Sequence, residues 1–230
     1  QQQQQQQRQE EGREEEGEPQ QLPQQPDTKT LRPLSVEHAV SMIQQACSAV
    51  AHLHLGPEVC HRDIKPENFI VHTDPNGAPV VKLADFDLAT IHNRAAMCRT
   101  ICGTMPFTAP EVMLKQSYNG LAADIWSLGV VLLEVLCGVR ILERALSLTL
   151  TKPEKGPDTD ALRFIARTFE ERPGFASDVI EERCREELRS IALPGKVMLQ
   201  GMLTVDVSQR WNAEQLSSSM QSLEVGRGAV

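Results

Sequence analysis

The chain has 230 residues, 40% of them hydrophobic, which is enough for one substantial core. Its formal net charge of −8 disfavours nucleic acid as a partner, because phosphate backbones are bound by clustered Lys and Arg. The six cysteines form no C-x-x-C pair and no signal peptide is recognisable, so we expect a reducing, cytoplasmic or nuclear setting.

Residues 1–34 differ in composition from the rest of the chain. Twelve of the first 25 residues are Gln, and most of the others are Glu, Pro, Gly or Arg. Such a segment buries too little apolar surface to offset the entropy lost on ordering, so we expect a disordered Gln/Glu-rich low-complexity tail. The alternative, that this segment mediates association, rests on composition alone.

Apolar residues recur at spacings of three and four from Val36 to Ala51. This period predicts an amphipathic helix whose apolar face lies in the core, with Ser35 as its N-cap after Pro33.

The stretch from His61 to Asn68 reads H-R-D-I-K-P-E-N and places an acid, a cation and an amide close together. After it, residues 68–72 and 79–86 read as two short strands joined by a turn at 74–77, where Pro-Asn-Gly favours a reversal of the chain. Such a hairpin would carry Asn68 at its entry and Asp85 at its exit. Two oxygen-bearing side chains would then meet at one end of the hairpin.

Beyond the hairpin, the chain carries D-F-D at 85–87, C-G-T at 102–104 and A-P-E at 109–111. Residues 122–137 are apolar on every face, which predicts a fully buried helix ended by Gly138. The longest apolar stretch within it, 125–136, is too short to span a bilayer, so we expect no membrane segment.

The C-terminal part is less informative. Residues 151–158 read as a loop, and no motif can be named between 140 and 190. Residues 196–203 and 213–223 are predicted to form the closing helices, separated by D-V-S-Q-R-W at 206–211.

These motifs, in this order, resemble those of a eukaryotic-type serine/threonine protein kinase catalytic domain. The octapeptide 61–68 resembles the catalytic loop H-R-D-L-x-x-x-N, D-F-D resembles the metal-binding D-F-G, and A-P-E closes the activation segment in that family. Lys65 is the form that this loop takes in serine/threonine kinases, and tyrosine kinases match less well. The overall pattern, especially P-E-N-F-I-V after Lys65, is most similar to calcium/calmodulin-dependent-type kinases. The alternative is an all-helical domain in which His61 and Asp63 merely cap a helix.

The resemblance implies a fold and a domain division. It covers residues 35–224 and corresponds to the large C-terminal lobe of a protein-kinase-like fold, mainly α with a small β-hairpin, followed by a tail at 225–230. The N-terminal lobe is expected to be missing, because neither a Gly-rich phosphate-covering loop nor a lysine in an apolar strand precedes Asp63.

The resemblance also implies catalytic roles. Asp63 would deprotonate the attacking hydroxyl, and Lys65 would neutralise charge on the γ-phosphoryl group of ATP. Asn68 and Asp85 would hold Mg²⁺, so that Lys65, Asn68 and Asp85 together bind the cofactors. Thr104 would hydrogen bond to Asp63 and Lys65.

Further residues are assigned structural or regulatory roles by the same resemblance. Asp124 would hold backbone amides of the catalytic loop, the alternative being that it caps its own helix. Glu111 and Arg210 would form a partly buried ion pair that fastens the activation segment. Thr100 would carry an activating phosphate paired with Arg62, the alternative being an unmodified loop threonine.

Asp87 departs from the family pattern, which has Gly at this position. Its side chain is expected to restrict switching of the loop or to alter metal affinity, because the backbone there often needs unusual freedom.

The function implied is transfer of the ATP γ-phosphoryl group to Ser or Thr hydroxyls of a protein substrate, with a partner chain or N-terminal lobe completing the site. The alternative is a catalytically impaired, kinase-derived interaction or scaffold module. A truncated reading frame would also explain the missing lobe.

Overall fold

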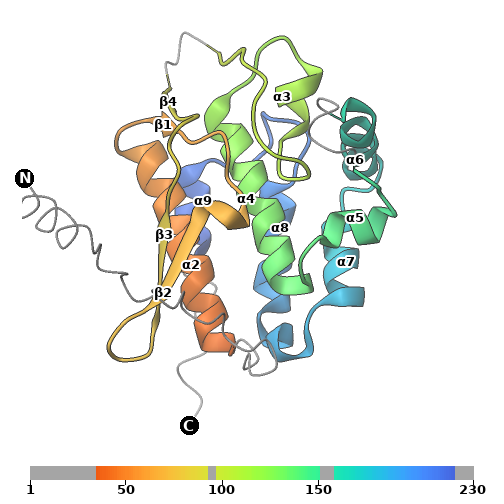
Figure 1. Ribbon diagram of the computed structural model, residues 1–230. Helices are drawn as coiled ribbons and strands as arrows, with labels where there is room; N and C mark the ends of the chain where they lie inside the picture. Colours follow the sequence, from red (N-terminus) through yellow and green to blue (C-terminus); the bar gives the residue numbers. More distant parts are fainter. Residues whose placement is uncertain (1–34, 93–96, 151–157, 221–230) are drawn as a thin grey trace, which may run out of the picture. The chain divides into compact units, whose positions relative to one another are not determined.

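The computed structural model describes residues 35–92, 97–150 and 158–220. These residues all lie within one compact unit of the chain, Leu34–Val230. The predicted tails at 1–34 and 225–230 and most of the predicted loop at 151–158 lie outside the described residues. Helices dominate the described part (Figure 1), and their bounds are α2 Val36–Leu55, α3 Pro110–Leu114, α4 Gly120–Cys137, α5 Ile141–Leu146, α6 Thr159–Glu171, α7 Phe175–Arg183, α8 Ala192–Met202 and α9 Ala213–Ser219.

Helix α4 runs through the centre of the core (Figure 1) and is buried on nearly every face. Asn119 caps its start by accepting a hydrogen bond from the Ala122 amide, and Gly138 ends it with a φ of 96°. The buried helix predicted at 122–137 is confirmed. At 18 residues α4 is longer than the apolar stretch 125–136 and has the length and composition of a membrane span, but most of it is buried inside the fold, as in a core helix.

Helix α2 lies against α4, α9 and the hairpin. Ser35 is its N-cap and accepts a hydrogen bond from the His38 amide, as predicted. The apolar face buries Ile43, Cys47 and Val50 in the core. Helix α2 is therefore anchored in the core directly before the segment that leads to His61.

The predicted hairpin is present as strands β2 (Phe69–Thr73) and β3 (Pro79–Leu83). They pair antiparallel with Phe69 opposite Leu83 and Thr73 opposite Pro79. The second strand ends at Leu83, three residues before the predicted end, because the backbone at Asp85 turns into the left-handed region with a φ of 63°. Asn68 lies just before β2 in a short 3-10 helix, η2 (Pro66–Asn68), rather than in the strand.

A second, smaller ladder was not predicted. Strand β1 (Val59–Cys60) pairs antiparallel with β4 (Thr90–Ile91). Two-residue strands carry too little alternation to be recognised in a sequence. This ladder holds the residues before His61 against the segment that follows Asp85.

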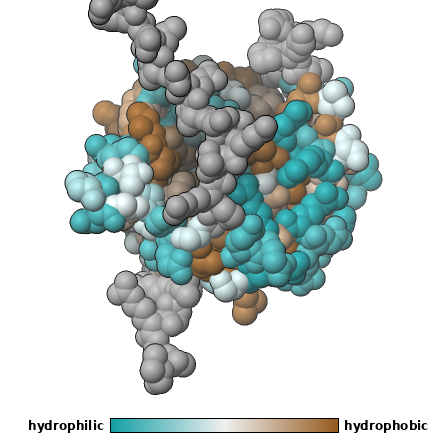
Figure 2. Space-filling view, turned by 60° about the horizontal axis from the view of Figure 1, so that its bottom comes forward, coloured by the Kyte–Doolittle hydropathy of each residue, from teal (hydrophilic) through white to brown (hydrophobic). Residues whose placement is uncertain are grey.

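The C-terminal helices cover the remaining side of α4. The predicted closing helices correspond to α8 and α9; α8 begins at Ala192, directly after the 3-10 helix η4 (Glu186–Ile191). The region 140–190, for which no motif could be named, forms α5, α6 and α7. On the face shown in Figure 2, hydrophilic side chains predominate and apolar ones are exposed in scattered patches.

Candidate active site

The Asp63 carboxylate is the centre of a compact polar cluster. Lys65 Nζ donates to Asp63 Oδ2 at 2.7 Å, and Thr104 Oγ1 donates to Oδ1 at 2.9 Å. The Lys65 ammonium also donates to the Thr104 hydroxyl at 3.1 Å, which closes a triangle of acid, cation and hydroxyl. The side chains of Asp63 and Lys65 are 11% and 19% exposed, so both remain within reach of a substrate.

Asn68 is fixed by the same aspartate. Its Nδ2 donates to the Asp63 carbonyl at 2.8 Å and to Asp63 Oδ2 at 3.3 Å. The turn that makes this contact possible is η2, which begins at Pro66. Because the amide nitrogen is engaged with Asp63, the Asn68 side-chain oxygen is the atom left for a metal ion.

Asp85 is placed at this site by the backbone. The preceding residue, Ala84, donates its amide to the Asn68 carbonyl at 2.9 Å, and its own carbonyl lies 3.0 Å from His61 Nε2. Asp85 itself is exposed and left-handed, a conformation that Asp tolerates better than most residues. The hairpin therefore brings Asp85 beside Asn68 and the catalytic loop.

The donor set at this end of the hairpin fits a magnesium ion that is held jointly with a nucleotide. Asn68 and Asp85 offer oxygen atoms, the ligands that Mg²⁺ prefers. Among the described residues, no group of three or more His, Cys, Asp or Glu side chains could hold a metal ion. Mg²⁺ sites usually combine one or two carboxylates with phosphates and water, so two protein ligands suffice in the presence of a nucleotide.

Asp87 does not need the backbone freedom expected at this position. The left-handed residue in the D-F-D motif is Asp85, and Asp87 is not among the residues with positive φ. A Cβ at position 87 is therefore compatible with this backbone, and the expected restriction would concern other conformations of the loop.

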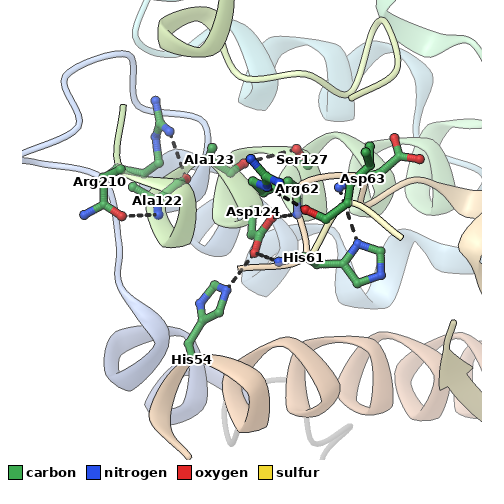
Figure 3. A network of polar contacts seen from close by, with 11 residues as sticks. His54, His61, Arg62, Asp63, Ala122, Ala123, Asp124, Ser127 and Arg210 are labelled. Atoms are coloured by element: carbon green, nitrogen blue, oxygen red, sulfur yellow. Dashed lines mark hydrogen bonds and ion pairs between the residues drawn. The ribbon is translucent and has the colours of Figure 1, made fainter. Parts of the chain in front are cut away.

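Asp124 fastens the catalytic loop to helix α4 (Figure 3). Its carboxylate accepts hydrogen bonds from the backbone amides of His61 at 2.7 Å and Arg62 at 2.8 Å, which are the predicted contacts. His54 Nε2, from the last turn of α2, lies 3.0 Å from the same carboxylate. The alternative role as helix cap is wrong, because Asn119 caps α4.

Arg62 shows why the loop needs this anchor. Its φ is 67°, in the left-handed region that a residue with a long side chain rarely adopts. The Asp124 carboxylate accepts hydrogen bonds from the two consecutive amides that lead into this strained position, those of His61 and Arg62. Hydrogen bonds to a buried carboxylate offset the strain and orient the next residue, Asp63.

Glu111 and Arg210 form the predicted ion pair. The guanidinium donates from Nη1 and Nη2 to the two carboxylate oxygens, and the side chains are 3% and 0% exposed, so the pair is fully rather than partly buried. Arg210 also donates to the carbonyls of Thr204 and Ala122, and lies 5.1 Å from the ring of Trp126. Residue 111 at the end of the activation segment is thereby fixed to the core.

Arg62 and Thr100 are connected through the side chain of Tyr118. Arg62 Nε donates to the Leu88 carbonyl at 2.6 Å, and its guanidinium lies beside the Tyr118 hydroxyl. That hydroxyl donates to the Thr100 carbonyl at 2.9 Å. Thr100 itself is exposed.

The sequence interpretation missed several residues at this site. His54 lies beyond the predicted helix at 36–51 and Tyr118 belongs to no motif, so neither was assigned a role, although His54 makes a buried and Tyr118 a partly buried polar contact at the site. No local pattern marks them, since their partners are 70 and 18 positions away in the chain. Trp126, under Arg210, lies within the helix predicted at 122–137, but the sequence interpretation assigned it no role.

Comparisons with known proteins agree with this geometry. The sequence matches the family model for the protein kinase domain over residues 20–220. It is 32% identical over 190 residues to ribosomal protein S6 kinase alpha-4 of Mus musculus, which covers 82% of this chain and 22% of that protein. It is 33% identical over 180 residues to serine/threonine-protein kinase DCLK3 of Mus musculus, covering 77% of this chain and 20% of that protein.

A shorter segment is more similar to a plant protein. Over 96 residues the chain is 46% identical to CBL-interacting serine/threonine-protein kinase 24 of Arabidopsis thaliana, covering 41% of this chain and 20% of that protein. The chain thus spans about a fifth of the length of these relatives. The closer likeness to calcium/calmodulin-dependent-type kinases stays a prediction. Because the family model covers most of the chain and the catalytic-loop residues meet in one cluster, the chain belongs to the protein kinase domain family.

Proposed function

We propose that this site transfers the γ-phosphoryl group of ATP to a Ser or Thr hydroxyl of a protein substrate. The observation that carries the proposal is the cluster in which Lys65 and Thr104 both hydrogen bond to the Asp63 carboxylate. An acid beside a cation suits a reaction in which a proton leaves the attacking hydroxyl while negative charge moves on the phosphoryl group. The names of the relatives as serine/threonine kinases support the same substrate class.

Each side chain has one task in the proposed reaction. Asp63 orients the substrate hydroxyl and accepts its proton as the oxygen attacks the γ-phosphorus. The bond from that phosphorus to the oxygen bridging it to the β-phosphate breaks, and ADP leaves. Lys65 neutralises charge on the phosphoryl oxygens during transfer. The Thr104 hydroxyl bonds both Asp63 and Lys65 and fixes the positions of their side chains relative to each other.

Asn68 and Asp85 would hold Mg²⁺ through their side-chain oxygens. When bound, the ion supplies positive charge to the β- and γ-phosphate oxygens. Asn68 is already oriented for this role by its hydrogen bonds to Asp63. Asp85 is exposed and held by the backbone of its neighbour Ala84, so its carboxylate is available to a nucleotide complex.

Mg²⁺-dependent ATP binding and phosphoryl transfer to Ser, Thr and Tyr peptides test the proposal on the full 230-residue chain, alone and with a kinase N-terminal lobe supplied. We expect Asp63→Asn to abolish transfer but keep binding, and Asp85→Asn to lose the Mg²⁺-dependent part of binding. Asp160→Asn, at an exposed surface pair, is the matched control and should change neither. Absence of ATP binding in both settings, or transfer to Tyr alone, would contradict the proposal.

An interaction module is the second candidate function. It is favoured by apolar side chains exposed on the hairpin beside the site, Ile70 at 56% and Val71 at 47%, followed by Phe86 at 46%. We expect an N-terminal kinase lobe or a partner chain to cover them, because apolar surface of this kind is stabilised by burial. Partner binding together with no ATP binding in either setting would favour this function over catalysis.

Phosphorylation of Thr100 is proposed as the activating input. Support comes from its exposure and from the Arg62 guanidinium near its backbone, since an Arg pairs well with a phosphate. Mass spectrometry of the active protein would detect the phosphate, and Thr100→Ala should then lower activity.

The six free cysteines support a cytoplasmic or nuclear location, where thiols stay reduced.

A further inference from the structure

The thiols of Cys60 and Cys98 lie together against Gly120, the first residue of α4. A Cβ on Gly120 would stand 2.6 Å from Cys60 Sγ and 3.1 Å from Cys98 Sγ. Both sulfurs therefore occupy the space that a side chain at position 120 would fill, and glycine there allows them to meet.

These cysteines come from two segments whose backbones are already fixed. Cys60 is the last residue of β1 and pairs with Thr90 of β4, directly before the catalytic loop. Cys98 lies in the activation segment, where its amide and carbonyl exchange two hydrogen bonds of 2.9 Å with Tyr118. A bond between the sulfurs would form between two positions that the fold already holds close together.

The two thiols differ in their access to solvent. Cys60 is fully buried, and burial, with the nearby Asp124 carboxylate as a further cause, raises the pKa of its thiol to about 12. Cys98 is partly exposed. An oxidant arriving from solvent therefore meets Cys98 first, and Cys60 is the thiol placed to react with the oxidised sulfur.

We propose that Cys60 and Cys98 are a reversible oxidation site, at which a peroxide converts the two thiols into a disulfide. The Cys98 thiol attacks one peroxide oxygen, the O–O bond breaks, and Cys98 becomes a sulfenic acid with release of water. The Cys60 sulfur then attacks the Cys98 sulfur, the S–O bond breaks, and a second water leaves with the Cys60 proton. Two thiols are oxidised by two electrons, and one hydrogen peroxide is reduced to two waters.

The disulfide would join the residue before the catalytic loop to the activation segment. The loop that it closes, residues 60–98, contains Asp63, Lys65, Asn68 and Asp85. Oxidation would restrict the motion of the activation segment at a point two residues before Thr100. This chemistry needs no phosphoryl transfer, so it stands independently of the proposed function.

The other cysteines provide internal comparisons. Cys102 Sγ lies 3.5 Å from the Tyr118 hydroxyl and is partly exposed, so it tests whether exposure alone determines the product. Cys137 and Cys184 are both buried, and their thiols donate to the carbonyls of Val179 and Arg185. Because neither thiol is accessible to an oxidant from solvent, both should stay reduced.

The experiment treats the reduced full chain with hydrogen peroxide, alkylates the remaining thiols, digests without reductant and maps the peptides by mass spectrometry. We expect a peptide pair joined through Cys60 and Cys98, two hydrogens lighter than the separate peptides and absent after treatment with dithiothreitol. The pair should be lost in Cys98→Ser and in Cys60→Ala, and kept in Cys102→Ser. Circular dichroism establishes that each variant is folded.

Two results would overturn the site. In one, Cys98 proceeds to sulfinic acid while Cys60 stays a free thiol, which is alkylated once the oxidised protein is denatured. In the other, the cross-link to Cys60 disappears in Cys102→Ser and persists in Cys98→Ser, which would make Cys102 the partner. Hydrogen exchange gives a second measurement: the amides of Cys98 and Tyr118 should exchange more slowly after oxidation, and unchanged exchange would contradict the restriction of the segment.

Discussion

His54 Nε2 and Asp124 Oδ2 lie 3.0 Å apart, with side chains only 3% and 1% exposed. This contact joins the last turn of α2 to the second turn of α4, next to the catalytic loop (Figure 3). The same carboxylate receives the amides of His61 and Arg62. The position of Asp63 is therefore set by the packing of two core helices rather than by the loop itself.

Removing this anchor should destabilise the protein strongly. Asp124→Ala leaves two buried amides without an acceptor, and each such loss costs about 1–3 kcal/mol, so we expect the free energy of unfolding to fall by about 3 kcal/mol or more. Urea unfolding followed by circular dichroism measures it. Asp160→Ala, which removes only an exposed pair with Arg163, should change it by less than about 1 kcal/mol. Similar losses in both variants would refute the anchoring role.

The buried pair between Glu111 and Arg210 should show strong coupling. Arg210→Met leaves the Glu111 carboxylate buried without its cation, and breaking such a pair costs about 3–5 kcal/mol. Glu111→Gln combined with Arg210→Met should be less destabilised than the sum of the single variants, since no uncompensated charge then remains. A double-mutant cycle from urea unfolding gives the coupling energy, and additive effects would contradict the pairing.

Thr104 should affect turnover more than stability. Its hydroxyl bonds both Asp63 and Lys65, so Thr104→Val removes the hydrogen bonds that fix these two side chains relative to each other. If the proposed transfer operates, we expect kcat to fall by roughly 10- to 100-fold, because small misplacements of catalytic groups cost about this much. Thr104→Ser restores a hydroxyl and should recover most of the rate. Equal activity of the Val and Ser variants would show that the Thr104 hydroxyl does not contribute to turnover.

Gly120 should not tolerate a methyl group. In Gly120→Ala the new Cβ would lie 2.6 Å from Cys60 Sγ, so the chain must shift, and overpacking of this kind costs about 1–3 kcal/mol. Adding Cys60→Ala removes the sulfur and should recover part of that loss. Thermal unfolding of the two single variants and the double variant measures the effect. A double variant that is no better than the additive expectation would show that the two residues do not compete for this space.

Glu134 should make stability depend on pH. Burial raises the pKa of its carboxyl, although a hydrogen bond from the Arg140 amide opposes the shift, and Glu143 adds to it. The folded state therefore favours the protonated form, and stability is lost as pH rises from the ordinary pKa of 4.5 through the folded-state pKa. Glu134→Gln keeps an oxygen acceptor for Arg140, so its stability relative to the unmodified chain should increase as pH rises above the ordinary pKa of 4.5.

The control for this prediction is Glu170→Gln, at an exposed position of α6. Its free energy of unfolding should follow that of the unmodified chain across the same pH range. If Glu134→Gln also followed the unmodified chain, burial of Glu134 would not influence stability.

Much of the local structure could be predicted because its causes are local. The Ser35 cap, the hairpin turn at Gly77 and the stop at Gly138 follow from preferences of single residues, and helix α4 follows from its continuous apolar composition. The contacts of Thr104 with Asp63 and Lys65 were predicted from the kinase resemblance, whereas the direct contact of Lys65 with Asp63 was not. The end of β3 was predicted wrongly, because residue type does not reveal the left-handed backbone at Asp85.

The sequence by itself determined the family, the buried central helix and the identity of the residues around Asp63. Only the tertiary structure showed that His54 supports Asp124, that β1 pairs with β4, and that Cys60 meets Cys98 on Gly120. The physical reason is that the two kinds of feature depend on residues at different separations along the chain. Helical period, caps and turns act over a few residues, whereas these contacts join positions tens of residues apart and exist only because the helices and the activation segment pack in one particular arrangement.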